Sequence, residues 1–261
     1  MSCGLIVKLS ADPDINRDLE AVVRSTLTEF LTVFPGCPPA GRRPLHVSYS
    51  SGIAITDSIT DPKVYRIRLS VCDRSYDQLV FQFGHELCHV FADPRRSNWF
   101  VECCCAMVSL LLLRRLSETW IFSPPFPNWT TYAPKFREYA ERRVRQATNA
   151  VFRSDSLPHS DQLRKWLVSV RPSLPENLYE RERKVIISEM IRPFFEKSAE
   201  NWEALRFLGQ ACIPPPVDLT DFNKNADFRF DRWFETVPNH LKQIVREVRD
   251  ILDDNPPFEI P

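Results

Sequence analysis

The 261-residue chain has no excess of either charge and no long apolar segment. Lysine plus arginine and aspartate plus glutamate each total 34, so no global field favours nucleic acid or an anionic membrane as a partner. The longest apolar run, Cys103–Leu113, is well short of the roughly 20 residues that cross a bilayer. The first residues reach Lys8 and Asp12 without the apolar core of a secretory signal. We therefore expect a cytoplasmic protein that binds neither nucleic acid nor membranes.

Paired cysteine motifs are also missing, because none of the eight cysteines forms a Cys-x-x-Cys pair. Eight cysteines in a chain this long do not suggest a disulfide scaffold, and we expect reduced thiols. Cys103, Cys104 and Cys105 are consecutive, and neighbours on a helix point in different directions. That triplet cannot surround a zinc ion by itself, so we interpret it as three small residues of a buried helix.

The chain does contain a clear change of hydrophobic period at Tyr76. Before it, a helical pattern over 12–34 is accompanied by short segments rich in β-branched residues. The expected strands cover residues 5–9, 45–49, 53–56 and 64–71. From Tyr76 onward apolar residues recur at helical spacing until Asp93-Pro94, where the proline ends the helix, and a second buried helix is expected over 98–116.

Beyond Glu118 the sequence has a different character, since three prolines interrupt it and only helical patterns follow. The expected helices cover 136–149, 178–195, 202–208 and 233–252. We place a boundary here, between a metal-binding subdomain (1–117) and a helical subdomain (118–261). The predicted fold class is α+β, with a small twisted sheet and one motif helix in the N-terminal half and a mainly helical C-terminal half.

A His-Glu-x-x-His motif lies on the helix that begins near Tyr76. His85 and His89 are one turn apart on its polar face, with about 6 Å between their backbone positions, so their ring nitrogens can converge on one ion. Glu86 is rotated off that line and can reach a water bound to the ion. Zinc lowers the pKa of such a water to about 7, which would make Glu86 the general base of a hydrolysis. The motif predicts one catalytic Zn²⁺ per chain.

Catalytic zinc needs a third protein ligand, and Glu102 is the best candidate. It follows His89 by 13 positions in an otherwise apolar helix, where a carboxylate is costly unless it is paired or binds a metal. The alternative is an ion pair with a nearby arginine: Arg95, Arg96 or Arg114. Asp93 is a rival ligand, but its position beside Pro94 is typical of a helix end.

Other potential ligands are less well placed. Cys88 lies between the two histidines, where a sulfur ligand would crowd the ion, so we interpret it as a packing residue or a redox-sensitive neighbour. His46 and His240 lack a partner at ligand spacing, which favours structural roles. His159 either reaches the cleft or belongs to a loop or helix start, and the second role is favoured.

Together, His85, Glu86, His89 and Glu102 resemble the zincin metallopeptidases, and among them a compact gluzincin. In that family two motif histidines and a downstream helical glutamate bind zinc. The expected order of strand, helix, strands, motif helix and glutamate helix is similar to the upper half of the zincin fold. The resemblance implies a zinc metallopeptidase, a hydrolase that cuts peptide or protein substrates. The alternative is a catalytically silent zincin-like interaction or sensor protein.

The resemblance is short, and two positions depart from it. The interval from His89 to Glu102 is shorter than in the thermolysin-like group, and Ala106 stands where that group has an aspartate behind its histidine. The partner that orients the histidines is therefore open, with three candidates: Asp73, Asp77 and Asp93.

The family also implies a substrate groove and an oxyanion-stabilising side chain. Such enzymes bind the substrate as an extended strand along one edge of the upper sheet, for which residues 46–56 are the candidate. The oxyanion is stabilised by a side chain from the helical half. The candidates are Tyr179, His159, Tyr132 and Arg181.

Overall fold

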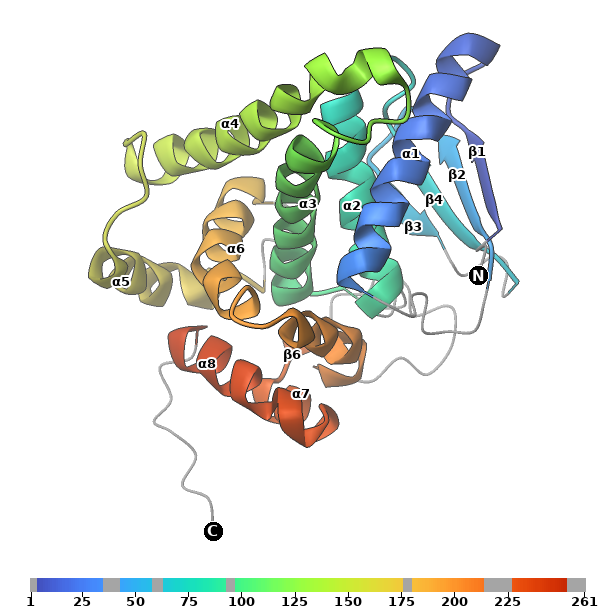
Figure 1. Cartoon of the computed structure of the whole chain (residues 1–261). Helices are drawn as coiled ribbons and strands as arrows, with labels where there is room; N and C mark the ends of the chain where they lie inside the picture. The colour runs from blue at the N-terminus through green and yellow to red at the C-terminus, as the bar shows by residue number, and fades with distance from the viewer. Residues whose placement is uncertain are drawn as a thin grey trace.

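The computed structural model describes residues 4–34, 43–57, 63–92, 97–175, 180–213 and 227–252. They form a four-stranded sheet packed against helices, followed by a mainly helical region (Figure 1). This confirms the predicted α+β class. None of the helices in these ranges has the length and apolar character that a bilayer crossing requires.

The sheet is mixed, and only one of its faces is packed. Its strands are β1 (Leu5–Lys8), β2 (Leu45–Tyr49), β3 (Ile55–Asp57) and β4 (Tyr65–Leu69). They lie in the order β1-β2-β4-β3, with β1, β2 and β4 parallel and β3 antiparallel to β4. Alternate residues of β4 are buried and exposed, which is the pattern of a sheet with one face on the core.

The edge strand next to the motif helix is β3. The prediction that residues 46–56 form an edge is wrong for 46–49, because those residues belong to β2, which pairs with β1 on one side and β4 on the other. Of the strands within 46–56, only β3 (Ile55–Asp57) has an open side, and the other edge of the sheet is β1. Strand order depends on how the crossovers pack, so local strand propensity does not reveal which strand lies at the edge.

Helices α1 (Pro13–Val33) and α2 (Tyr76–Ala92) pack beside the sheet, and α3 (Trp99–Thr119) lies on the far side of α2 (Figure 1). The Asn98 side chain caps α3 by accepting hydrogen bonds from the backbone N–H groups of Phe100 and Val101. Helices α2 and α3 approach closely at Gly84, where a Cβ atom would lie 2.8 Å from Leu112 Cδ1. Glycine therefore permits the contact that sets His85 against α3.

The helical half packs around the other side of α3. Its helices are α4 (Ala133–Phe152), α5 (Ser160–Val170), α6 (Arg181–Phe195), α7 (Phe230–Thr236) and α8 (Lys242–Leu252), with short 3₁₀ segments η1 (Pro127–Tyr132), η2 (Arg171–Ser173), η3 (Ala199–Ala211) and η5 (Asn239–Leu241). Helices α4 and α6 contact α3 directly. Buried apolar residues from both halves form one cluster, and the boundary at 117–118 stays a prediction.

Two expectations for this half are wrong. The single helix predicted over 233–252 is divided into α7, η5 and α8, because Pro238 disfavours helical geometry at Val237. The expectation of helices alone is also wrong, since β5 (Cys212–Ile213) pairs antiparallel with β6 (Asp227–Phe228).

Candidate metal centre

Helices α2 and α3 bring the three predicted ligands together. His85 Nε2 lies 3.4 Å from Glu102 Oε2, and His89 Nε2 lies 3.3 Å from Glu102 Oε1. Nitrogen and oxygen ligands about 2.0 to 2.1 Å from a tetrahedral zinc ion are about 3.3 to 3.4 Å from one another. Both imidazoles therefore lie at ligand-like separations from this carboxylate, each from a different one of its oxygens.

The Glu102 carboxylate is held by two further side chains. Ser97 Oγ donates a hydrogen bond to Oε1 at 2.6 Å, and Lys184 Nζ of α6 lies 2.9 Å from Oε2. Burial raises the pKa of Glu102, but His89 and His85 lower it more, so it lies well below its usual range. The group is ionised, as a metal ligand must be.

Of the three arginines considered as partners of Glu102, only Arg114 is among the described residues, and it pairs with another carboxylate. Arg114 forms a bidentate ion pair with Glu189 at 2.9 and 3.0 Å. Arg95 and Arg96 lie outside the described residues, as does the rival ligand Asp93. The ion-pair alternative therefore takes a different form, in which Lys184 is the cation.

His89 shows how the centre behaves without metal. Burial lowers the pKa of its imidazole, but the adjacent Glu102 carboxylate raises it more, to about 9. The metal-free centre is accordingly an ion-pair cluster of His89, Glu102 and Lys184. A metal ion that binds here must displace the proton from His89.

The Glu86 side chain lies in the same region and is hydrogen-bonded to the edge strand β3. Its side chain is buried, with 3% of the residue exposed. Thr56 Oγ1 of β3 donates a hydrogen bond to Glu86 Oε2 at 2.8 Å and lies 3.2 Å from the Glu86 carbonyl oxygen. One hydroxyl thus fixes the carboxylate expected to act as the base.

These residues line a cavity of about 770 Å³ between the sheet edge and the helical half. One side is formed by residues 51–56, which lead into and include part of β3. The lining also includes the motif residues and, from the helical half, Tyr139, Arg143 and Arg181. The cavity lining therefore combines a strand edge, the motif residues and cationic side chains.

The four oxyanion candidates have different positions. Arg181 lines the cavity, whereas Tyr132 is not among its lining residues. The Tyr132 hydroxyl instead accepts a hydrogen bond from the backbone N–H of Asp77 at 3.4 Å, and burial raises its pKa to about 12. His159 is exposed ahead of α5 and does not line the cavity. Tyr179 lies outside the described residues.

Of the three aspartates considered as partners that orient the histidines, Asp93 lies outside the described residues, and the contacts given for Asp73 and Asp77 are with other groups. Asp77 lies 3.8 Å from Arg142, and Asp73 accepts a hydrogen bond from the backbone N–H of Ser75. His46 lies in β2 and His240 in η5, and neither lines the cavity.

Four residues of the centre escaped sequence reasoning: Thr56, Ser97, Cys105 and Lys184. A ligand atom from each of Cys105, His85 and His89 lies within 4.8 Å of the others. The cysteine triplet is buried as expected, but this member of it lies near the two motif histidines. Its spacing of three residues from Glu102, which places both on one helix face, was the available signal.

Comparisons with other proteins add no identification. No protein-family model matches the chain, and neither the curated proteins nor the solved structures yield a match.

Proposed function

We propose that this protein is a zinc-dependent peptidase whose metal ligands are His85, His89 and Glu102. The observation that carries the proposal is the contact of both motif imidazoles with one carboxylate, at nitrogen-to-oxygen separations of 3.4 and 3.3 Å. The position of Glu86 in the same cavity supports hydrolysis rather than metal storage. Two imidazoles and one carboxylate are also a donor set typical of catalytic zinc.

Each protein group has a distinct task in this proposal. Zinc, when bound, supplies Lewis-acid chemistry that polarises a substrate carbonyl. Glu86 removes a proton from the attacking water and returns it to the leaving amine. Thr56 keeps the Glu86 carboxylate oriented through its 2.8 Å hydrogen bond. Arg181 is the described residue, among those considered, that can face a developing negative charge from the wall of the cavity.

The substrate is proposed to bind as an extended peptide. The open side of β3 offers backbone N–H and C=O groups, as in other proteins that bind a peptide by strand addition. Thr56 belongs to that strand, so the same three residues would hold both the substrate backbone and the general base. A peptide or protein substrate fits this arrangement better than a compact small molecule.

The test combines metal content with cleavage of a diverse peptide library. Purified wild-type protein should hold about one zinc per chain and cleave peptides. Glu86→Gln should keep the zinc and lose cleavage, because the amide cannot take the proton. Metal-free protein from zinc-replete medium would contradict the metal site, whereas zinc-bound protein that cleaves nothing would contradict the peptidase.

The silent zincin-like sensor is the second candidate function. Lys184 favours it, since a cation 2.9 Å from Glu102 opposes binding of a second positive charge. Under this hypothesis the ion pairs of His89 and Lys184 with Glu102 stabilise the fold without a catalytic ion, and Glu86→Gln changes no activity.

A further inference from the structure

We propose that Cys105 is an additional metal ligand that joins His85 and His89 from the buried side and, while it is bound, closes the centre, so that the zinc form of the wild type cleaves peptides slowly. This inference concerns regulation of the proposed metal site and rests on it. It would explain why a nucleophilic side chain lies directly beside the two histidines.

The geometry permits such a ligand with a small displacement. A ligand atom from each of Cys105, His85 and His89 lies within 4.8 Å of the others. In a tetrahedral site with zinc–sulfur and zinc–nitrogen bonds of about 2.3 and 2.0 to 2.1 Å, sulfur and nitrogen are about 3.6 Å apart. The sulfur therefore has to move inward by at most about 1.2 Å, which a change of the cysteine side-chain torsion can provide. The described group of ligand atoms within 4.8 Å of one another does not include Glu102, so its carboxylate has to move as well for all four residues to bind one ion.

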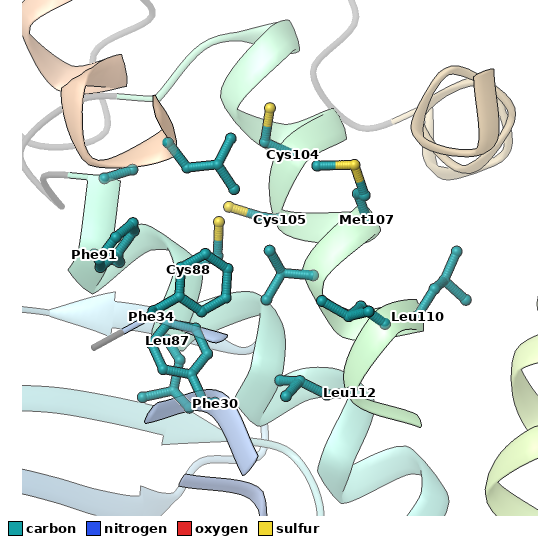
Figure 2. Packing of buried hydrophobic residues seen from close by; sticks show 14 of the residues in the cluster. Phe30, Phe34, Leu87, Cys88, Phe91, Cys104, Cys105, Met107, Leu110 and Leu112 are labelled. Carbon is teal, nitrogen blue, oxygen red and sulfur yellow. The ribbon is translucent and has the colours of Figure 1, made fainter. Parts of the chain in front are cut away.

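Cys105 approaches from the interior and not from the cavity. The residue is fully buried and is not among the residues that line the cavity. Figure 2 shows the sulfurs of Cys105 and Cys88 pointing toward one another from α3 and α2, and the two thiols are hydrogen-bonded. Cys104, its neighbour on α3, points away from this pair. Of these two cysteines of the triplet, Cys105 is the one directed at α2, the helix that carries the motif.

A buried thiol at this position is a conditional ligand. Burial raises the pKa of Cys105 well above its usual value, and the hydrogen bond with Cys88 acts in the same direction. A cysteine binds zinc or cobalt as its thiolate, so the S–H proton passes to solvent as the metal–sulfur bond forms. Metal binding should consequently release one more proton from wild-type protein than from a variant that lacks this thiol.

The functional consequence follows from the number of ligands. Catalytic zinc keeps three protein ligands and an exchangeable position, whereas four protein ligands close a tetrahedral site. With His85, His89, Glu102 and Cys105 all bound, a substrate carbonyl has no position on the ion. Departure of the thiol would restore the three-ligand centre of the proposed peptidase.

Cobalt(II) spectroscopy of the full chain tests the proposal. Cobalt bound to a thiolate gives a sulfur-to-metal charge-transfer band in the near ultraviolet, separate from the visible bands of the ion. We expect that band in wild-type protein and in the matched variant Cys104→Ala, which removes an equally buried thiol from the same helix. Cys105→Ala should lose the band, keep the visible bands and release one fewer proton on metal binding. Its zinc form should also cleave peptides at least tenfold faster than wild type.

The outcomes separate this proposal from the proposed function. Cobalt bound without the charge-transfer band would overturn the role of Cys105 and leave the His-Glu site intact. No cobalt binding at all would overturn both. Equal zinc-dependent turnover by wild type and Cys105→Ala would overturn the closed state. If Cys105→Ala does not fold, the nearly isosteric Cys105→Ser replaces it in every comparison.

Discussion

Replacement of Glu102 by glutamine separates its two roles, as partner of Lys184 and as metal ligand. Both side chains are largely buried, with 16% and 13% exposed. Removing one charge from a buried ion pair costs about 3 to 5 kcal/mol of stability. Because the glutamine oxygen can still accept a hydrogen bond from Lys184, we expect the free energy of unfolding to fall by the lower value, about 3 kcal/mol. For a chain of this size that lowers the metal-free Tm by roughly 6 to 12 °C.

The substitution should also reduce the stabilisation that zinc gives to the folded protein. Free zinc at 1,000 times Kd stabilises the wild type by about 4 kcal/mol, or roughly 8 to 16 °C. If loss of an anionic ligand weakens affinity by about 100-fold, the same zinc stabilises Glu102→Gln by only about 1.4 kcal/mol, or roughly 3 to 6 °C. Thermal unfolding with zinc and with chelator measures both effects, and Glu118→Gln, an exposed carboxylate on the same helix, is the control. An undiminished zinc shift in Glu102→Gln would refute Glu102 as a ligand.

Three further predictions follow from other contacts. Thr56→Val removes the hydroxyl that donates a hydrogen bond to Glu86 Oε2 at 2.8 Å. A hydrogen bond to a charged group is worth about 1.5 to 3 kcal/mol, so its loss should lower kcat/KM by roughly 10- to 150-fold. Zinc content should not change and Thr56→Ser should restore activity; equal activity of the valine and serine variants would contradict the role. In the presence of a chelator, protonation of His89 stabilises the folded protein, because its pKa is raised from 6.5 to about 9. The free energy of unfolding should therefore be highest below pH about 6.5 and fall by up to about 3 kcal/mol as the pH rises through about 9. A constant urea midpoint across that window would oppose this interpretation, and His89→Gln should abolish the dependence. Gly84→Ala should destabilise the protein by about 1 to 2 kcal/mol in urea unfolding, since overpacking against Leu112 exceeds the gain in helix propensity, and a stabilised variant would contradict the close helix contact.

Much of the fold was predictable because its signals are local. The segment 45–49 coincides with β2, and the expected helix from Tyr76 coincides with the start of α2. Both signals come from the spacing of apolar residues, which tertiary packing did not override. The division at Pro238 was also readable, because a proline disfavours helix at the preceding residue.

The remainder of the site depends on contacts that local patterns do not encode. Thr56 meets Glu86 across 30 positions, and this contact requires β3 to lie at the sheet edge. Lys184 meets Glu102 across 82 positions, after α6 packs on α3. The sequence offered several arginines nearer in the chain and no reason to prefer this lysine. The packing of Cys105 toward α2 is equally a product of how two helices meet.

The central claim is that His85, His89 and Glu102 bind one zinc ion. The most direct test is an anomalous difference map at the zinc absorption edge, from crystals of the full chain purified without added chelator. We predict a single strong peak about 2.0 to 2.2 Å from both Nε2 atoms and from a Glu102 carboxylate oxygen. Crystals grown with zinc that show no peak there, with Lys184 still paired to Glu102, would contradict the claim.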